Sequence, residues 1–233
     1  MKKTKLEIFY IVIRILSLVL FISNIIFAVF TNDDSHRSRL IFNTVQSGLM
    51  FVFTFFPGYI EKKGNVDIPN FMEIIFVVFC LCHFILGEIS DFYIKVPHWD
   101  SILHTFSGSM FAILAFSLIG LLNDSKKVSL SPIFVALFAL SFSMAVGACW
   151  EIVEFGVDCI FGTNMQRFDN SFTRDPLMGQ IALMDTMKDL ILDFLGALLI
   201  CIIGFLGMKS KTNVFHKWQI EKKKKIKEVE LNE

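Results

Sequence analysis

Three carboxylates lie in a stretch that otherwise has the composition of a membrane-spanning helix. Glu151, Glu154 and Asp158 are spaced i, i+3 and i+7, so one face of a helix would present all three. A carboxylate at membrane depth is costly and normally faces other protein groups or a water-filled cavity. We therefore expect the chemistry of this chain to gather at this face.

Two further apolar stretches carry polar residues at helical spacing. Asp100 and His104 are four residues apart, and Asp185, Asp189 and Asp193 follow one another in steps of four, so each set shares one helical face. Asp100 and Asp185 stand where N-caps are typical, and capping alone could explain both. Asp193 is two turns further in, about 12 Å at 1.5 Å per residue, which is too deep for a cap.

The composition is that of a membrane protein. Of 233 residues, 54% are hydrophobic and only 19% are charged, against about 25% charged in a soluble domain. The apolar residues form long runs, which predict an all-α, polytopic membrane protein with about six transmembrane helices. We expect a single transmembrane domain over 1–208 and a basic cytoplasmic tail over 209–233. The predicted spans are 8–30, 40–60, 70–88, 101–122, 132–160 and 185–207.

The distribution of Lys and Arg predicts the orientation. Most of these residues outside the spans fall on the side of the N-terminus, which places both termini in the cytoplasm of a multi-pass cell-membrane protein. The Lys run 222–225 could contact anionic lipid or form a solvated charged end. The net charge is zero, which gives no support for a nucleic-acid partner. The expected partner is the lipid bilayer, and the sequence does not identify protein partners.

This orientation brings the polar groups of three helices to one level. The fourth span begins, the fifth ends and the sixth begins on the outer side, so their polar residues should meet near the outer leaflet. Several carboxylates at one site stay ionised only with a cation nearby. Lys188, Arg167, Arg174, a metal ion or a proton could supply that charge.

Carboxylates with one His suit Mg, Mn, Fe or Zn. The alternatives are a proton- or ion-coupled relay and polar contacts that hold the helices together. The sequence contains no H-E-x-x-H or E-x-x-H pair, so zincin and di-iron templates do not apply. The predicted metal ligands are Asp100, His104, Glu151, Glu154, Asp189 and Asp193, the predicted catalytic residues are Glu151, Glu154 and Asp193, and the predicted binding residues are Asp158, Asp185, Lys188, Arg167 and Arg174.

The order of three short motifs resembles a known family. D-x-x-x-H-T occurs at 100–105, W-E-I-V-E at 150–154 and D-T-x-x-D-L-x-x-D-x-x-G-A at 185–197. This order resembles the YjdF-like family of uncharacterised bacterial inner-membrane proteins and is more distantly similar to VanZ-like proteins. The resemblance implies a multi-spanning membrane protein, and the VanZ-like similarity points to a role in the cell envelope or toward glycopeptides.

These observations favour a metal-dependent hydrolase that acts on an envelope or lipid-linked substrate from the outer side. The long connection 162–184 would serve as a lid. A proton- or cation-coupled transporter is an alternative, although the inner halves of the spans hold few ionisable groups. A non-catalytic envelope or binding protein is another.

Overall fold

The computed structural model describes residues 3–124, 130–170, 173–210, 212 and 219–223. These residues are almost entirely helical, which confirms the predicted all-α class. Most of the predicted tail, 209–233, falls outside the described residues, and of the Lys run 222–225 only Lys222 and Lys223 are described. The chain divides into two compact units, residues 1–84 with 218–233 and residues 85–217. The single domain expected over 1–208 stays a prediction.

Within the described residues, six helical segments are long and apolar enough to cross a membrane. They match the six predicted spans one for one, which confirms the polytopic helical architecture. Their bounds are Lys5–Phe30, Asp34–Gly64, Asn70–Ile89, Trp99–Leu122, Pro132–Phe161 and Gly179–Lys209.

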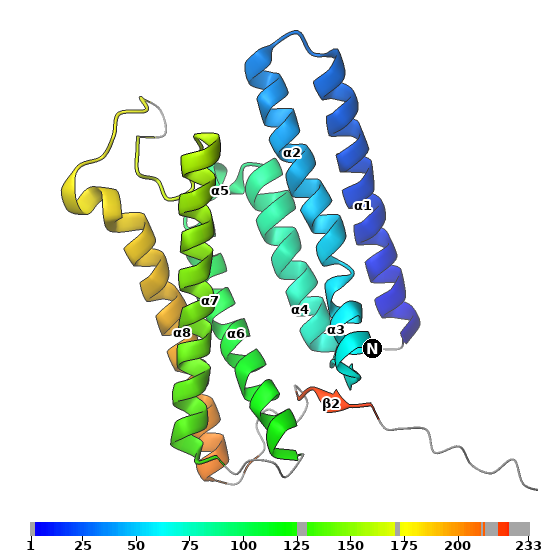
Figure 1. Cartoon of the computed structure of the whole chain (residues 1–233), viewed down its shortest axis with the longest axis vertical. Coiled ribbons are helices and arrows are strands. Elements are labelled where there is room, and N and C mark those ends of the chain that lie inside the picture. Colours follow the sequence, from blue (N-terminus) through cyan, green and yellow to red (C-terminus); the bar gives the residue numbers. More distant parts are fainter. Residues whose placement is uncertain (1–2, 125–129, 171–172, 211, 213–218, 224–233) are drawn as a thin grey trace, which may run out of the picture. The chain divides into compact units, whose positions relative to one another are not determined.

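The first unit begins with a helical hairpin (Figure 1), in which α1 and α2 lie side by side. Asp33 ends the short turn and caps the second helix, because its carboxylate accepts hydrogen bonds from the backbone N–H groups of Ser35 and His36. The unit also contains a short antiparallel strand pair in which Val66 lies opposite Lys222. Its elements are α1 (Lys3–Phe30), α2 (Asp34–Phe53), α3 (Phe56–Gly64), β1 (Val66–Asp67), α4 (Asn70–Cys80) and β2 (Glu221–Lys222).

The second and third predicted spans differ in form from the structure. The second span begins at Asp34 rather than residue 40, because the Asp33 cap starts the helix before the apolar run. This span is also two helices rather than one, since the chain leaves α2 at Thr54 and Pro57 opens α3. The third span changes from α4 to a π-helix, η1 (Leu81–Ile89), within which the boundary between the two units falls.

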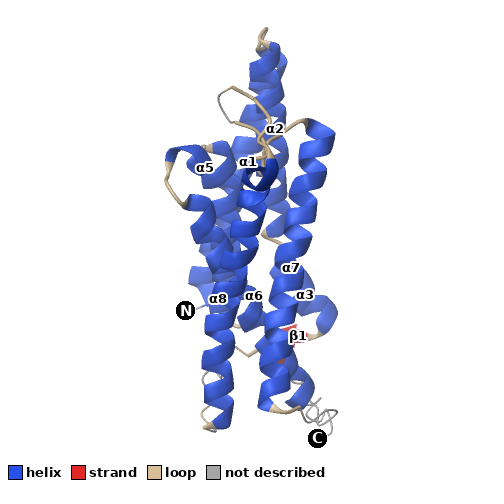
Figure 2. Cartoon of the chain, turned by 90° about the vertical axis from the view of Figure 1, so that its left-hand side faces the viewer, coloured by secondary structure: helices blue, strands red, loops and turns tan. Residues whose placement is uncertain are grey.

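The second unit is built on three long helices that pack against one another in pairs (Figures 1 and 2). The first and third run antiparallel to the second, so the start of one, the end of the next and the start of the last lie at the same end. Ser131 caps the middle helix, Pro132 occupies its first turn, and Gly162 ends it with φ at +65°. Its elements are α5 (Phe92–Lys95), α6 (Trp99–Asp124), α7 (Pro132–Phe161), η2 (Gly179–Leu183) and α8 (Met184–Lys209).

Glycines set the close approach of these helices. A Cβ on Gly108 of α6 would collide with the backbone of Asp193 on α8, and a Cβ on Gly196 would collide with the carbonyl of Thr105. On α7, a Cβ at Gly147 would lie 2.5 Å from Asp193 Oδ2. Small residues allow membrane helices to pack closely, and here Gly108 and Gly147 both lie against the buried Asp193.

Candidate functional site

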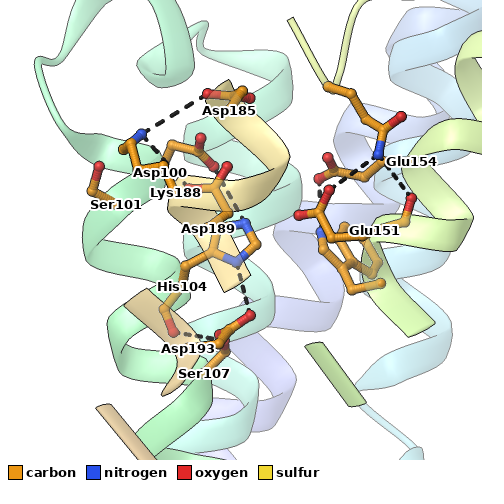
Figure 3. Close-up of polar contacts among 12 residues, drawn as sticks. Asp100, Ser101, His104, Ser107, Glu151, Glu154, Asp185, Lys188, Asp189 and Asp193 are labelled. Carbon is orange, nitrogen blue, oxygen red and sulfur yellow. Dashed lines mark hydrogen bonds and ion pairs between the residues drawn. The ribbon is translucent and has the colours of Figure 1, made fainter. Parts of the chain in front are cut away.

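The facing sides of α6 and α8 present four buried polar side chains to one another (Figure 3). Asp100 and His104 come from α6, one turn apart, and Asp189 and Asp193 come from α8, also one turn apart. Asp189 and Asp193 are only 2% and 1% exposed. The i, i+4 spacing in the sequence therefore places all four side chains in the same interface.

His104 is held in one orientation by the aspartate below it. Its Nδ1 lies 3.1 Å from Asp193 Oδ2, and Ser107 Oγ donates a 2.6 Å hydrogen bond to Asp193 Oδ1. Because a carboxylate only accepts hydrogen bonds, Nδ1 carries the proton. In a neutral imidazole the lone pair is then on Nε2, which faces Asp100 Oδ1 at 3.7 Å.

Potential metal-ligand atoms of Asp100, His104 and Asp189 lie close together. One atom each of Asp100, His104 and Asp189 lies within 4.8 Å of the other two. Two carboxylate oxygens and one imidazole nitrogen in this arrangement suit a divalent metal ion. Among the described residues, Asp100, His104 and Asp189 are the set of His, Cys, Asp or Glu side chains placed closely enough to share one metal ion.

Two basic side chains border the triad formed by Asp100, His104 and Asp189. Arg167 Nη2 lies 3.4 Å from Asp100 Oδ2, and its Nη1 lies 3.2 Å from Asp185 Oδ1. Lys188 Nζ lies 3.6 Å from Asp189 Oδ1. Both side chains remain more than one-third exposed, so they form the outer edge of the cluster.

The glutamates of α7 form a second polar group that faces the first. Figure 3 shows Glu151 and Glu154 extending toward the side chains of α6 and α8. Trp150 Nε1 donates a 2.8 Å hydrogen bond to Glu154 Oε1, and Gln166 Nε2 donates a 3.1 Å bond to Glu151 Oε2. Glu151 Oε1 is buried and has no hydrogen-bond partner among the described residues.

Asp158 has a different environment from these glutamates. Its carboxylate accepts hydrogen bonds from the Thr163 hydroxyl at 2.6 Å and from the backbone N–H groups of Met165 at 2.7 Å and Gln166 at 3.0 Å. These bonds fold the start of the connection back over the end of α7. Asp158 therefore positions the segment that carries Gln166 and Arg167 to the acidic cluster.

Of the remaining predicted binding residues, Asp185 lies at the cluster and Arg174 does not. Arg174 pairs with Asp169 at 3.1 Å within the connection and is exposed, so it does not join the cluster. Asp185 lies in the first turn of α8 and pairs with Arg167, and it is not the N-cap. Gln166 was not predicted from the sequence, and Trp150 was named only as part of the W-E-I-V-E motif. The i, i+4 spacing of Trp150 and Glu154 is the signal that could have assigned Trp150 its contact.

Comparison with known proteins identifies the chain's family. A family model described as "Predicted membrane protein (DUF2238)" matches residues 12–210. An uncharacterized protein of Thermotoga maritima is 31% identical over 161 residues, which cover 69% of this chain and 74% of the relative. The chain belongs to this family of predicted membrane proteins. No solved structure matches the chain.

Membership of this family agrees with the six helical spans and confirms a multi-pass membrane protein embedded in the lipid bilayer. The stretch that matches the family model contains the whole of the polar cluster, from Asp100 to Asp193. It ends at residue 210, two residues into the predicted basic tail, 209–233.

Proposed function

We propose that this protein is a divalent-metal-dependent hydrolase whose site lies at the outer-leaflet end of α6, α7 and α8. Asp100, His104 and Asp189 are its proposed metal ligands. The observation that carries the proposal is the convergence of their three ligand atoms within 4.8 Å. The proposed ions are those that carboxylates and imidazole bind together, Mg²⁺, Mn²⁺, Fe²⁺ or Zn²⁺.

The contact between His104 and Asp193 supports a metal site. Metal-binding histidines almost always donate their second ring N–H to a carboxylate, carbonyl or water, which fixes the ring and raises its basicity. The 3.1 Å contact of His104 Nδ1 with Asp193 has this form, and Ser107 in turn orients Asp193. We therefore assign Asp193 to positioning His104 rather than to binding the ion or the substrate.

The balance of hydrogen-bond donors and acceptors also favours a cation. Asp189 Oδ1 and Glu151 Oε1 are buried atoms without a hydrogen-bond partner among the described residues. A buried carboxylate oxygen without a donor is costly. Lys188, at 3.6 Å from Asp189 Oδ1, is beyond hydrogen-bonding distance, so a bound cation would satisfy this oxygen better.

Glu151 is the proposed general base. It faces the triad from α7 (Figure 3), and its free oxygen could accept a proton. In the proposed reaction, water oxygen bonds to the electrophilic atom of the substrate while one water proton passes to Glu151. The bond to the leaving group breaks with its electron pair, and the leaving group then takes that proton. Glu154, which accepts a hydrogen bond from Trp150, is assigned to binding the substrate.

The proposed substrate is a component of the envelope or a lipid-linked molecule. The likeness of three motifs to YjdF-like and VanZ-like proteins supports a bacterial inner-membrane location and an envelope role. The Lys and Arg distribution supports cytoplasmic termini, which would open the site toward the outer side. The apolar surfaces of α7 and α8 beside the site would give a lipid-linked substrate access from the bilayer.

The proposal is tested with proteoliposomes made from a bacterial total lipid extract. The purified protein is loaded with Mn²⁺ or Zn²⁺ and incubated in H₂¹⁸O, and lipids and water-soluble products are analysed by mass spectrometry. We expect a product that carries one ¹⁸O atom with the wild-type protein. Chelation of the metal should abolish it, and re-addition of the ion should restore it.

The control variants separate the metal from the base. Glu151→Gln should retain the metal but lose the ¹⁸O product, since an amide cannot accept the proton. Asp175→Asn, in the exposed part of the connection, should behave as wild type. A metal-loaded wild-type protein that forms no more labelled product than Glu151→Gln would reject a hydrolase.

A cation-coupled transporter is a second candidate. It is favoured by buried polar side chains in the first unit, where Asn24 Nδ2 and Gln46 Oε1 have no hydrogen-bond partner among the described residues. Such residues within spans often border ion paths. Mn²⁺ uptake into proteoliposomes that depends on Asp189 would support transport, and its absence would exclude Mn²⁺ as the transported ion.

A further inference from the structure

We propose that Arg167, Lys188 and Ser101 form a subsite for the phosphate group of a lipid phosphate ester. This inference rests on the proposed function, because it places the phosphate beside the metal triad. It names the substrate class that the triad alone leaves open.

Arg167 is positioned by its backbone as well as by its charge. The hydrogen bond from Gln166 N to Asp158 fixes the preceding residue, and Arg167 itself has a φ of +48°, an uncommon value for a residue with a side chain. The guanidinium bridges Asp100 and Asp185 at 3.4 and 3.2 Å while 39% of the side chain stays exposed. Its planar group of donors matches the geometry of a phosphate.

Lys188 and Ser101 add donors at the same edge. The ammonium of Lys188 lies 3.6 Å from Asp189 and 3.9 Å from Asp185, which are both loose contacts. Ser101 Oγ is buried and has no hydrogen-bond partner among the described residues. Ser101 follows Asp100 in α6 and is drawn at the same edge of the group as Lys188 (Figure 3).

A bound metal would change the charge balance of this edge. An ion held by Asp100 and Asp189 competes with Arg167 and Lys188 for the same carboxylates. The carboxylates would then neutralise less of the positive charge of the guanidinium and the ammonium. An anion beside the metal would restore the balance, and charge-assisted hydrogen bonds from Arg and Lys are the usual means of holding phosphate.

The neighbouring surface favours a phosphate that is attached to a lipid. The start of α8 and the turn before it expose four large apolar side chains on either side of Asp185, each at least half exposed. These are Ile181, Leu183, Met184 and Met187. In a membrane protein this surface would lie against hydrocarbon chains, so a lipid could place its chain there and its phosphate at Lys188.

The experiment compares lipids that differ only in phosphate. Native mass spectrometry measures binding of dioleoyl phosphatidate and of dioleoylglycerol to the Mn²⁺-loaded protein in detergent, and calorimetry measures binding of inorganic phosphate. The metal content of each sample is determined in parallel. We expect Arg167→Gln and Lys188→Gln each to weaken phosphatidate binding about tenfold, with metal content and dioleoylglycerol binding unchanged.

Two matched variants complete the design. Lys95→Gln removes a cation that pairs with Asp91 outside the cluster, and it should bind phosphatidate as wild type does. Arg167→Lys, which keeps the charge, should retain more affinity than Arg167→Gln.

The outcomes separate this inference from the proposed function. Metal-loaded variants that bind phosphatidate as tightly as wild type would overturn the phosphate subsite and leave the metal site intact. Inorganic phosphate binding without phosphatidate binding would overturn the lipid assignment. A wild-type protein that binds no metal would reject the proposed function and this inference with it.

Discussion

The two compact units bury polar side chains in different ways. In the first unit most of the buried polar residues are neutral, such as Ser17 and Ser47, and the buried acid Glu73 accepts a 2.6 Å hydrogen bond from the Tyr10 hydroxyl. In the second unit the buried polar set consists mainly of acids. These are Asp100, Glu151, Glu154, Asp158, Asp189 and Asp193.

The contrast shows what a hydroxyl can do inside a membrane helix that a carboxylate cannot. Ser17 and Ser47 donate to the backbone carbonyls of Ile13 and Asn43 in their own helices, so their bonds are closed locally. A carboxylate has nothing to donate and needs a donor or a cation from elsewhere. The hydroxyls of Ser17 and Ser47 therefore need no partner from another helix. In the second unit, by contrast, carboxylate oxygens of Glu151 and Asp189 are buried without a hydrogen-bond partner among the described residues, as expected of a site that binds a cation.

The largest expected effect concerns the close packing of α6 against α8, which positions the residues of the site. Gly108→Val would place a branched side chain against the backbone of α8, which cannot yield, and should cost about 3 kcal/mol of stability. In the first unit, a Cβ at Gly48 would meet only the ring of Phe21 at 3.2 Å, so Gly48→Ala should cost less. Thermal unfolding followed by size-exclusion chromatography in detergent compares the two, and equal losses would contradict the difference in packing.

The next effect concerns the orientation of His104. Asp193→Asn replaces one carboxylate oxygen by an amide group, so the 3.1 Å contact to Nδ1 or the 2.6 Å contact to Ser107 changes. We expect metal affinity to fall about 10- to 100-fold, as for other residues that orient a ligand. Calorimetric titration with Mn²⁺ measures this loss. An unchanged affinity would show that Asp193 has only a packing role.

A smaller effect concerns the connection over the site. Asp158→Asn would weaken its bonds to the N–H groups of Met165 and Gln166, at a cost of about 1.5 kcal/mol. The loss should be local, so hydrogen exchange in 163–167 should speed up while the helices stay protected. Asp175→Asn, in the same connection, is the control and should leave exchange unchanged.

Much of this arrangement could be predicted from the sequence, because helix geometry fixes residues four apart on one face. This spacing predicts the pairs Asp100–His104 and Asp189–Asp193, and the Lys and Arg distribution predicts which helix ends would meet. The partner of Glu151 could not be predicted. It depends on the path of the connection, and only the structure shows that Asp158 directs Gln166 back to α7.

The same difference applies to the spans. Long apolar runs predict six spans, since the bilayer sets their length and composition. The break at Thr54 and the π-helix over Leu81–Ile89 depend on backbone hydrogen bonds that hydropathy does not encode.

The smallest expected effect lies in the first unit. Tyr10→Phe removes the 2.6 Å hydrogen bond to Glu73 and should cost about 0.6–1 kcal/mol. Metal content and product formation should not change. A loss of metal in this variant would show that the acidic cluster depends on the first unit, which would contradict a metal site built by the second unit alone.

The metal content of the purified protein shows whether Asp100, His104 and Asp189 bind an ion. Inductively coupled plasma mass spectrometry is applied to the wild type, to Asp189→Asn and to Glu73→Gln, which neutralises a buried acid in the other unit. We expect about one divalent ion per chain in the wild type and in Glu73→Gln, and a loss of that ion in Asp189→Asn. A wild-type protein with metal at background, or an Asp189→Asn variant that keeps the full amount, would contradict this expectation.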